Sequence, residues 1–371
     1  MRTLVTGGAG FIGSYVCEAL LQRGHKPIVL DNLDPQIHGE HAPWPSYMPA
    51  GTENHVGDVR DRALVRRLLA DCDAVIHLAA AVGVGQSMYK IEHYCSVSVL
   101  GTAVLLEEMI PWRRRLRKLI VASSMSVYGE GAYRDAEGNV RYPGPRPIEQ
   151  LKAGVWEPLD ERGRPLVPTA TPETKPLRPD SVYAVTKRDQ EEMCLVFGRA
   201  YEIPAIALRM FNVFGARQAL ANPYTGVAAI FCSRLLRNQP PLVFEDGNQR
   251  RDFVHVEDVA RAYVLALEND AARGMAVNLG SGQSISVNEI AATLAEALHK
   301  PLRPEISGKY RDGDIRHCFA DISLARQVLG WNPRYDFRSG VRTLLAWVLS
   351  QAGVQAAGDS YAELGQLGLL K

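Results

Sequence analysis

The chain has 371 residues, and its 42 Lys and Arg against 41 Asp and Glu give a formal net charge of +1. A charge this close to zero gives no support for a nucleic-acid partner or a membrane-surface partner. The length suffices for one large α/β domain or two fused lobes with a sizeable core. The six cysteines are scattered without a CxxC pair, which argues against a disulfide framework and a cysteine-rich metal site.

Two further features bear on where the protein works. No apolar run in the sequence approaches membrane-spanning length, and no signal peptide precedes the first predicted strand, which starts at Arg2. The basic run RRRLRK at 113–118 fits a solvated helix end better than a phosphate-binding patch. We therefore expect a soluble, reduced, cytoplasmic protein with no nucleic-acid and no membrane partner.

Short apolar runs alternate with helical patterns from the first residues onward. The strand candidates are RTLVT (2–6), PIVLDN (27–32), AVIHLAA (74–80), KLIVASS (118–124) and a strand within IPAIALRMFNV (203–213). A helical pattern from Ser14 to Gln22 follows the first of them and is closed by Gly24. Continuous apolar strands separated by helices are typical of an α/β fold with a doubly wound parallel sheet of the Rossmann type.

Three glycines, Gly7, Gly10 and Gly13, lie where the first predicted strand meets the first helix. Glycines at such a junction permit a tight turn and let backbone N–H groups approach a pyrophosphate at the helix N-terminus. Asp31 ends the second strand, where a carboxylate accepts hydrogen bonds from an adenosine ribose and repels the 2′-phosphate of NADP. The order of strand, glycines, helix, strand and acid predicts NAD as the cofactor. Asp58 is placed to bond the adenine edge, and Asp61 is the better N-cap for the helix that follows.

A second constellation predicts proton transfer. Ser124 and Ser126 follow a predicted strand and therefore lie at the carboxyl edge of the sheet, where doubly wound proteins bind ligands. Tyr183 and Lys187 are one helical turn apart and share a face. By itself this pair fits a tyrosine covered by a lysine chain. Beside a dinucleotide cradle and a strand-end serine, it predicts that Lys187 lowers the pKa of Tyr183, that Tyr183 is a general base, and that Ser124 holds the substrate oxygen.

The segment between Gly129 and Asp180 has a different texture, with nine prolines and little periodicity. We interpret it as a long ordered insertion or lid over the site, because structureless loops of this length are uncommon unless functional. A disordered linker is the alternative, and the aromatic residues of the segment argue against it.

These patterns suggest a division of the chain. We expect an NAD-binding Rossmann domain at 1–211 with a Pro-rich insertion at about 130–178. A mainly substrate-binding lobe follows at 212–350, with strands and helices that return to the first domain. The tail at 351–371 stays unassigned.

Ten motifs follow one another as they do in extended short-chain dehydrogenases/reductases. They are TGGAGFIG, DNL, GDVRD, HLAA, SSMSVYG, YAVTK, LRMFNVFG, RRDFVHVEDVA, NLGSG and YRDGDIRHCFADISLARQVLGWNP. The chain most resembles NAD-dependent nucleotide-sugar epimerases of the UDP-glucose 4-epimerase type, from residue 1 to about 345 outside the insertion. The resemblance implies NAD, a nucleoside-diphosphate sugar as substrate, and a homodimer that pairs helices around 95–110 and 183–200.

The resemblance also implies roles for individual residues. It gives Ser124, Tyr183 and Lys187 as catalytic. The implied cofactor contacts are Gly7, Gly10, Phe11, Ile12, Gly13, Asp31, Asn32, Asp58, Val59, Leu78, Ala79 and Ala80, together with Tyr183 and Lys187. The implied substrate contacts are Ser126, Asn212, Arg251, Arg311 and Asp314. Arginines suit a diphosphate because the guanidinium can donate two parallel hydrogen bonds. The alternatives are a capping role for Asn212 and surface salt bridges for the arginines.

The sequence departs from the family pattern at several points. Met125 and Ser126 stand where dehydratases of the family carry an Asp-Glu pair, so a 4,6-dehydratase is not expected. Ser98 stands where the family usually has Asn, which leaves the geometry near Lys187 open. Cys318 stands where some relatives place a tyrosine beside the sugar, and a packed core cysteine is an equal alternative.

The insertion also departs from the pattern of insertion-bearing relatives. Its turns DAEG (135–138) and DERG (160–163) lie where some insertion-bearing relatives have the cysteine knuckles of a zinc ribbon. The insertion contains neither Cys nor His, so we expect no zinc.

The predicted reaction is epimerisation at C4 of a dTDP-6-deoxyhexose or a UDP-hexose. Tyr183 takes the C4 hydroxyl proton with help from Ser124, hydride moves to NAD, the transient 4-keto sugar turns over, and hydride returns to its other face. The insertion and VGVGQSMY (82–89) resemble bacterial epimerases of dTDP-6-deoxyhexoses. One alternative is an NAD(P)H-dependent nucleotide-4-ketosugar reductase. Another, of a different class, is a non-catalytic NAD-binding sensor or scaffold.

Overall fold

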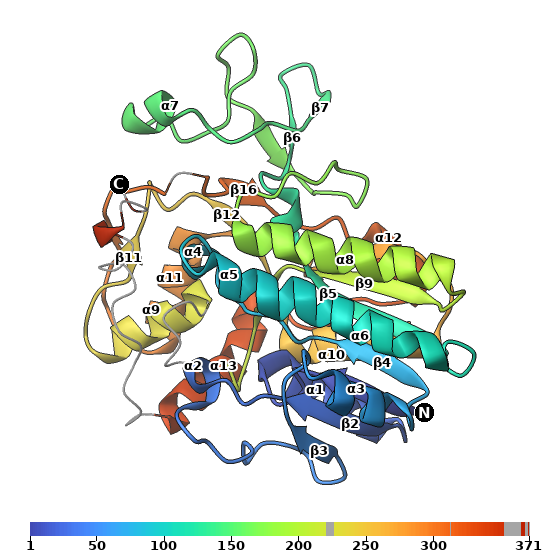
Figure 1. Cartoon of the computed structure of the whole chain (residues 1–371). Helices are drawn as coiled ribbons and strands as arrows, with labels where there is room; N and C mark the ends of the chain where they lie inside the picture. The colour runs from blue at the N-terminus through green and yellow to red at the C-terminus, as the bar shows by residue number, and fades with distance from the viewer. Residues whose placement is uncertain (220–225, 312, 352–364, 368–369, 371) are drawn as a thin grey trace.

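The centre of the protein is a seven-stranded parallel sheet in the order β13-β9-β5-β4-β1-β2-β3. The computed structural model describes residues 1–219, 226–311, 313–351, 365–367 and 370. The strands are β1 (Arg2–Thr6), β2 (Lys26–Asp31), β3 (Glu53–Val56), β4 (Ala74–His77), β5 (Lys118–Ser124), β9 (Ala205–Met210) and β13 (Ala276–Leu279). Helices cover both faces of the sheet (Figure 1), so inner strands such as β4 and β5 are buried along nearly their whole length. The predicted doubly wound, Rossmann-type α/β fold is confirmed.

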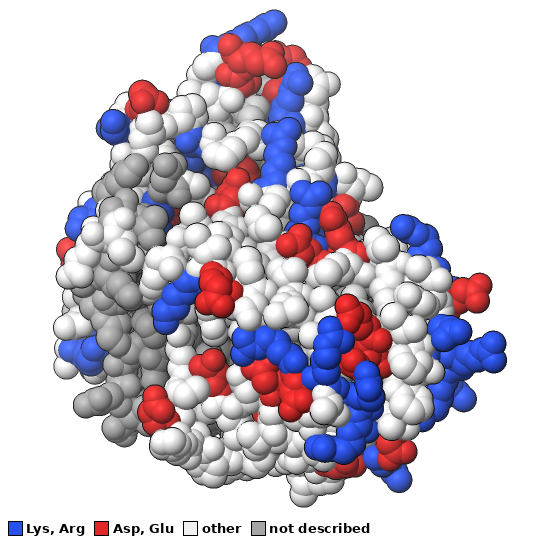
Figure 2. Space-filling view, viewed as in Figure 1, with Lys and Arg blue, Asp and Glu red and all other residues white. Residues whose placement is uncertain are grey.

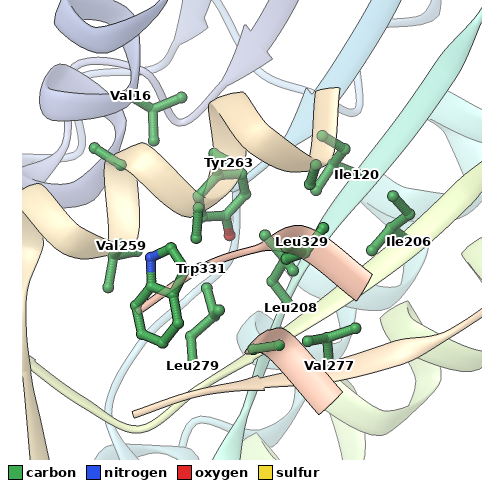
Figure 3. Close-up of a cluster of buried hydrophobic side chains, with 14 of the residues drawn as sticks. Val16, Ile120, Ile206, Leu208, Val259, Tyr263, Val277, Leu279, Leu329 and Trp331 are labelled. Atoms are coloured by element: carbon green, nitrogen blue, oxygen red, sulfur yellow. The ribbon is translucent and has the colours of Figure 1, made fainter. Parts of the chain in front are cut away.

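Alternate strand residues feed two separate cores. Val5 and Ile76 point into one cluster, whereas their chain neighbours Leu4 and Val75 point into the other. The first cluster is closed by α1 (Phe11–Gln22), α10 (Val256–Glu268) and α12 (Ser323–Leu329), the second by α3 (Arg62–Leu69), α6 (Gly101–Met109) and α8 (Val182–Ala200). Figure 3 shows the first cluster around the buried Trp331. Helices α10 and α12, from the later part of the chain, thus pack against the seven-stranded sheet.

A smaller lobe lies beside the carboxyl edge of the large sheet. Its strands are β10 (Asn212–Phe214), β12 (Arg250–His255), β14 (Ser284–Ser286), β16 (His317–Cys318), β11 (Leu242–Val243) and β15 (Glu305–Ile306). Its helices are α9 (Val227–Leu236), α11 (Val287–Ala297) and α13 (Phe337–Ser350). The remaining short helices of the body are α2 (Pro35–His38), α4 (Val84–Ser87), α5 (Ile91–Tyr94), η1 (Cys95–Leu100), η2 (Ile110–Trp112) and η3 (Met125–Tyr128).

One predicted strand divides between the two sheets. Strand β9 ends at Met210, and after Phe211 the chain continues as β10, which pairs with β12 of the smaller lobe. The expectation of one strand within 203–213 was therefore incomplete. The change of sheet carries Asn212 out of the large sheet and toward the smaller lobe.

The Pro-rich insertion is folded and projects from the body (Figure 1). It contains a three-stranded antiparallel sheet and one short helix. They are β6 (Ala132–Arg134), β7 (Val140–Arg141), β8 (Val167–Thr169) and α7 (Ile148–Lys152). At its tip, Arg164 donates to Asp160 in its own turn and to Glu137 in the other turn. No group of three His, Cys, Asp or Glu placed to hold a metal occurs among the described residues.

One helix corrects an expectation from the sequence. Within the described part of the chain, Ile91–Trp112 forms one continuous helical run of 22 residues, and an 18-residue window of it has a mean hydropathy of 1.2, enough in length and composition to cross a membrane. The expectation that no run approaches this length was wrong. In the structure 44% of the apolar window is buried inside the fold. A packed helix of a globular domain passes the same test, so the finding is weak as a sign of a membrane span.

Candidate active site

The glycine-rich turn between β1 and α1 is a cradle that side chains would fill. Gly7 has a φ of +69°, and a Cβ added to it would lie 2.9 Å from the backbone nitrogen of Ala79. A Cβ on Gly13 would lie 2.2 Å from the carbonyl oxygen of Gly7. Gly10 is the N-cap of α1 and supplies no side-chain hydrogen bond, and the first turn of α1 carries no acidic residue. The N–H groups of that turn can therefore receive a phosphate, so the residues present fit a dinucleotide.

Asp31, at the end of β2, holds this cradle in place. Its carboxylate accepts hydrogen bonds from the backbone nitrogens of Ala9 and Leu33, each at 2.9 Å. One carboxylate has about four acceptor positions, so both oxygens can still accept from ribose hydroxyls. The acid thus has a structural role in addition to the predicted cofactor role.

The other predicted cofactor residues surround the same edge. Asp58 is paired with Arg60 at 2.6 Å, and this guanidinium lowers the pKa of Asp58. Asp61 accepts from the backbone nitrogen of Leu64 at 3.1 Å, which confirms it as the N-cap of α3. Phe11 and Ile12 begin α1, exposed Asn32 follows β2, buried Val59 follows Asp58, and Leu78, Ala79 and Ala80 follow β4.

The predicted catalytic serine and tyrosine meet at the end of β5. The Ser124 hydroxyl accepts hydrogen bonds from the backbone nitrogen of Ser126 at 3.2 Å and from the Ser126 hydroxyl at 3.0 Å. Tyr183 forms a side-chain hydrogen bond with Ser124. Because both Ser126 groups donate to Ser124, the Ser124 proton is directed to the phenol oxygen. Ser126, predicted to bind substrate, therefore also orients the catalytic serine.

The prediction that Lys187 lowers the pKa of Tyr183 was wrong for the protein chain alone. Burial raises the pKa of Tyr183, and the hydrogen bond from Ser124 offsets only part of that rise. The Lys187 ammonium is itself buried and donates to the carbonyl oxygen of Ala122 at 3.0 Å. Burial lowers the pKa of Lys187 to about 8. Burial therefore sets the direction of both pKa shifts, and the Lys187 charge does not account for the shift of Tyr183.

Two contacts that sequence reasoning missed hold the catalytic helix. The hydroxyl of Ser87, in the 82–89 segment, accepts from the backbone nitrogen of Tyr183 at 3.0 Å. Ser181 caps α8 by accepting from the backbone nitrogen of Ala184 at 3.2 Å. Ser181 precedes an apolar helical pattern, so a capping signal was present in the sequence. The Ser87 contact joins distant segments and left no such local signal.

Ser98, which replaces the usual Asn, lies in the π-helical turn η1. Its hydroxyl accepts from the backbone nitrogen of Ala81 at 3.3 Å, and its carbonyl accepts from the hydroxyl of Thr102 at 2.6 Å. Thr102 also contacts Gln190, one turn after Lys187 on α8, at 2.9 Å. The π-helical distortion at η1 therefore forms with a serine at position 98.

Apart from Ser126, which follows β5, the predicted substrate residues belong to the smaller lobe. Asn212 carries a buried side-chain oxygen without a hydrogen-bond partner in the structure. Arg251 donates to the carbonyl oxygens of Ile315 and Arg316 at 2.5 and 3.0 Å. The Arg311 guanidinium lies 5.0 Å from the ring centre of Phe244. Asp314 follows in the same turn, where its backbone nitrogen donates to the Arg311 carbonyl at 3.3 Å.

Cys318, the residue expected either beside the sugar or in the core, is buried in the first core cluster. Burial raises the pKa of its thiol to about 12. The packed-core interpretation therefore fits the structure.

A pH dependence follows from the two pKa shifts. The Tyr183–Lys187 pair is expected to lose its first proton near pH 8, because burial lowers the pKa of Lys187 to about 8 and raises that of Tyr183 above 10.0. Catalysis needs the ammonium–phenolate form, which is a minor but constant fraction of the pair that holds one proton. We expect kcat/KM to rise about tenfold per pH unit below this value and to level off above it; the positive charge of bound NAD would move the rise to lower pH.

Thermal melts in the same buffers are the control for this profile. The folded-state pKa of Lys187 lies below its ordinary value of 10.5. Between pH 8 and 10.5 the unfolded chain therefore binds more protons at this residue, and Lys187 makes the folded state more stable as pH rises. A kcat/KM that stays flat from about pH 5 to about pH 8 would contradict the assignment.

A dinucleotide cradle and a Ser-Tyr-Lys set at the carboxyl edge of a doubly wound sheet define a short-chain dehydrogenase/reductase of the extended type. The model of the NAD dependent epimerase/dehydratase family matches residues 3–150 and 160–280. The chain belongs to this family and is NAD-dependent, as predicted.

Named relatives agree with this assignment. The chain is 38% identical over 353 residues to dTDP-L-rhamnose 4-epimerase from Burkholderia thailandensis, covering 94% of this chain and 95% of that protein. The structure of UDP-glucose 4-epimerase with UDP-glucose from Thermotoga maritima matches with a TM-score of 0.77 at 29% identity, covering 95% of this chain and 100% of that one. UDP-glucose 4-epimerase from Thermus thermophilus in complex with NAD matches with a TM-score of 0.71 at 30% identity, covering 94% and 99%.

Proposed function

We propose that this protein is an NAD-dependent 4-epimerase of nucleoside-diphosphate sugars, with a dTDP-6-deoxyhexose as substrate and a UDP-hexose as the second candidate. The observation that carries the proposal is the contact between Ser124 and Tyr183 at the sheet edge, with Lys187 one turn behind. The rhamnose-type substrate is supported by the 38% identity to the Burkholderia protein.

The residues of this chain have distinct tasks in the reaction. As the phenolate, Tyr183 removes the proton from the C4 hydroxyl of the sugar and later returns it, and Ser124 donates a hydrogen bond to the phenolate oxygen. Lys187 supplies positive charge behind them. The glycine cradle and Asp31 would hold NAD, which would supply the hydride acceptor and donor for C4. Arg251 and Arg311 bind the diphosphate, which lets the keto sugar turn while its nucleotide stays anchored.

The neighbours of Ser124 favour epimerisation over dehydration. Met125 and Ser126 occupy the two positions after it, and both are largely buried. Elimination of water needs an acid and a base at the sugar in addition to the tyrosine. A thioether and a hydroxyl that donates to Ser124 supply neither.

The purified protein, without added cofactor, tests the proposal. Denaturation identifies any released nicotinamide, and NMR follows C4 stereochemistry with a panel of UDP- and dTDP-sugars that includes dTDP-L-rhamnose. Interconversion of one C4 pair with no net change in NADH absorbance is expected. Stoichiometric consumption of NAD(P)H on a 4-keto sugar would make the protein a reductase. Bound NAD without turnover of any sugar would favour a sensor.

We also propose that the protein is a homodimer in the cytoplasm. The α5–α6 run and α8 lie side by side (Figure 1), and a largely uncharged area lies over their middle (Figure 2). Leu100 and Val196 on these helices are 51% and 52% exposed. Exposed apolar side chains of this kind mark association surfaces. The six cysteines are all free, which fits a reducing compartment.

The double variant Leu100→Lys/Val196→Lys is expected to be monomeric by light scattering after size-exclusion chromatography. Four like charges across a two-fold axis would repel, and their burial would cost several kcal/mol. Val56→Lys is the matched control, because Val56 is 59% exposed on the edge strand β3, away from this face. A double variant with the wild-type mass would contradict the assigned interface.

A further inference from the structure

The base of the Pro-rich insertion contacts the 310–317 segment, of which the structure describes residues 310, 311 and 313–317, including Arg311 and Asp314. Trp156 packs against Tyr310 with ring centres 6.1 Å apart. Arg146 donates to the carbonyl oxygen of Asp314 at 2.9 Å. The insertion therefore touches this segment on either side of its predicted substrate residues.

The end of the segment is held by two carboxylates of the insertion. Glu157 accepts from the Arg316 guanidinium at 2.6 Å and from His317 at 2.8 Å. Glu130, which is buried, accepts from the backbone nitrogens of Arg316 and His317 at 2.8 and 2.7 Å. These contacts fix both the backbone and the side chains at the end of the segment.

A network of ion pairs through Glu245 connects the insertion to Phe244, whose ring lies beside Arg311. The buried Glu245 carboxylate pairs with Arg146 at 2.7 Å and with Arg316 at 2.8 Å. Glu245 has a φ of +52°, a left-handed conformation that a non-glycine residue keeps only when its surroundings hold it. Its chain neighbour Phe244 carries the ring beside the Arg311 guanidinium.

Arg251 depends on this segment as well. Its guanidinium donates to the carbonyl oxygens of Ile315 and Arg316. The position of these carbonyls is set by the Glu130 and Glu157 contacts to Arg316. The insertion thus governs the placement of both arginines assigned to the diphosphate, as well as that of Asp314.

We propose that Glu157 and Trp156 are positioning residues for nucleotide-sugar binding, through which the insertion sets the geometry of the 310–317 segment. The inference rests on the proposed function. Neither residue needs to touch the substrate. A shift of about 1 Å in a binding group can cost two orders of magnitude in rate or affinity, so small rearrangements at the base should be measurable.

Glu157→Gln tests the inference with little risk to folding. The Glu157 side chain is 35% exposed and lines an open cavity of about 500 Å³, so a poorly matched amide can still be hydrated. In the structure one carboxylate oxygen of Glu157 accepts from Arg316 and the other accepts from His317. The Gln amide replaces one of these oxygens by a nitrogen that only donates, so it cannot keep both contacts in this geometry. We expect KM for the nucleotide sugar and Kd for UDP or dTDP by calorimetry to rise roughly tenfold, while kcat stays within about twofold and NAD content is unchanged.

Glu137→Gln is the matched control, since it neutralises the exposed ion pair to Arg164 at the tip of the same insertion. It should leave KM, Kd and kcat unchanged. Trp156→Leu removes an uncharged contact to Tyr310 and should raise KM in the same direction as Glu157→Gln. It serves as the second variant if Glu157→Gln does not fold.

The outcomes separate the two proposals. Equal Kd values for Glu157→Gln and wild type would overturn the positioning role alone. A parallel loss of NAD, kcat and affinity in both base variants would also overturn it, because a general folding defect would explain the data. Wild-type protein that binds neither UDP nor dTDP would overturn the proposed function, and the positioning role with it.

Discussion

The Tyr183→Phe enzyme is expected to turn over its nucleotide sugar about a thousandfold more slowly than wild type while it retains NAD. Loss of a general base typically costs 10² to 10⁴-fold in rate. The substitution removes only the hydroxyl that bonds Ser124, whereas the bond from the Tyr183 backbone nitrogen to Ser87 remains. The fold and the cradle should therefore be unaffected.

Single-turnover and steady-state kinetics on the same C4 pair measure this effect, together with the NAD released on denaturation. Tyr201→Phe is the matched control, because Tyr201 lies at the opposite end of α8 with its ring 4.6 Å from that of Phe197. Turnover of Tyr183→Phe within about tenfold of wild type would remove Tyr183 from the role of general base.

Gly13→Ala is expected to destabilise the protein by about 3 kcal/mol and to abolish copurification of NAD. The added Cβ would lie 2.2 Å from the carbonyl oxygen of Gly7 and 2.6 Å from the Cα of Gly8. Both neighbours are backbone atoms of the cradle and cannot rotate away. Relief of the overlap requires α1 to move away from the turn, which separates the N–H groups that receive the phosphate.

Gly10→Ala separates the steric effect from the binding effect. Its Cβ would lie 3.4 Å from the Gly7 oxygen, and its φ of −68° is accessible to alanine. We expect a wild-type melting temperature with weaker NAD binding, because the methyl group obstructs the approach of the pyrophosphate to the backbone. Chemical denaturation measures the stability of each variant, and the NAD released on denaturation measures cofactor binding. Equal stability of the Gly13→Ala and wild-type proteins would contradict the assigned packing.

The local patterns of the sequence were sufficient for most of the sheet and for the cradle. Apolar runs gave β1, β2, β4 and β5, since strands covered on both faces are apolar throughout. The Tyr183–Lys187 pair was visible because residues one helical turn apart share a face whatever the rest of the fold does. Strand β13 was not predicted as part of the large sheet, because its pairing with β9 joins residues far apart in the chain.

The amino-acid sequence by itself therefore determined the fold class, the glycine-rich turn predicted to hold NAD, and the placement of Tyr183 and Lys187 on one helix face, because these features depend on patterns within short stretches of the chain. Only the tertiary structure decided the directions in which the pKa values of Tyr183 and Lys187 shift, because desolvation depends on everything packed around a group. It also decided the hydrogen bond from Tyr183 to Ser87 and the contacts of Glu157 with Arg316 and His317. Such contacts join segments that no local spacing relates, so they exist only once the chain has folded.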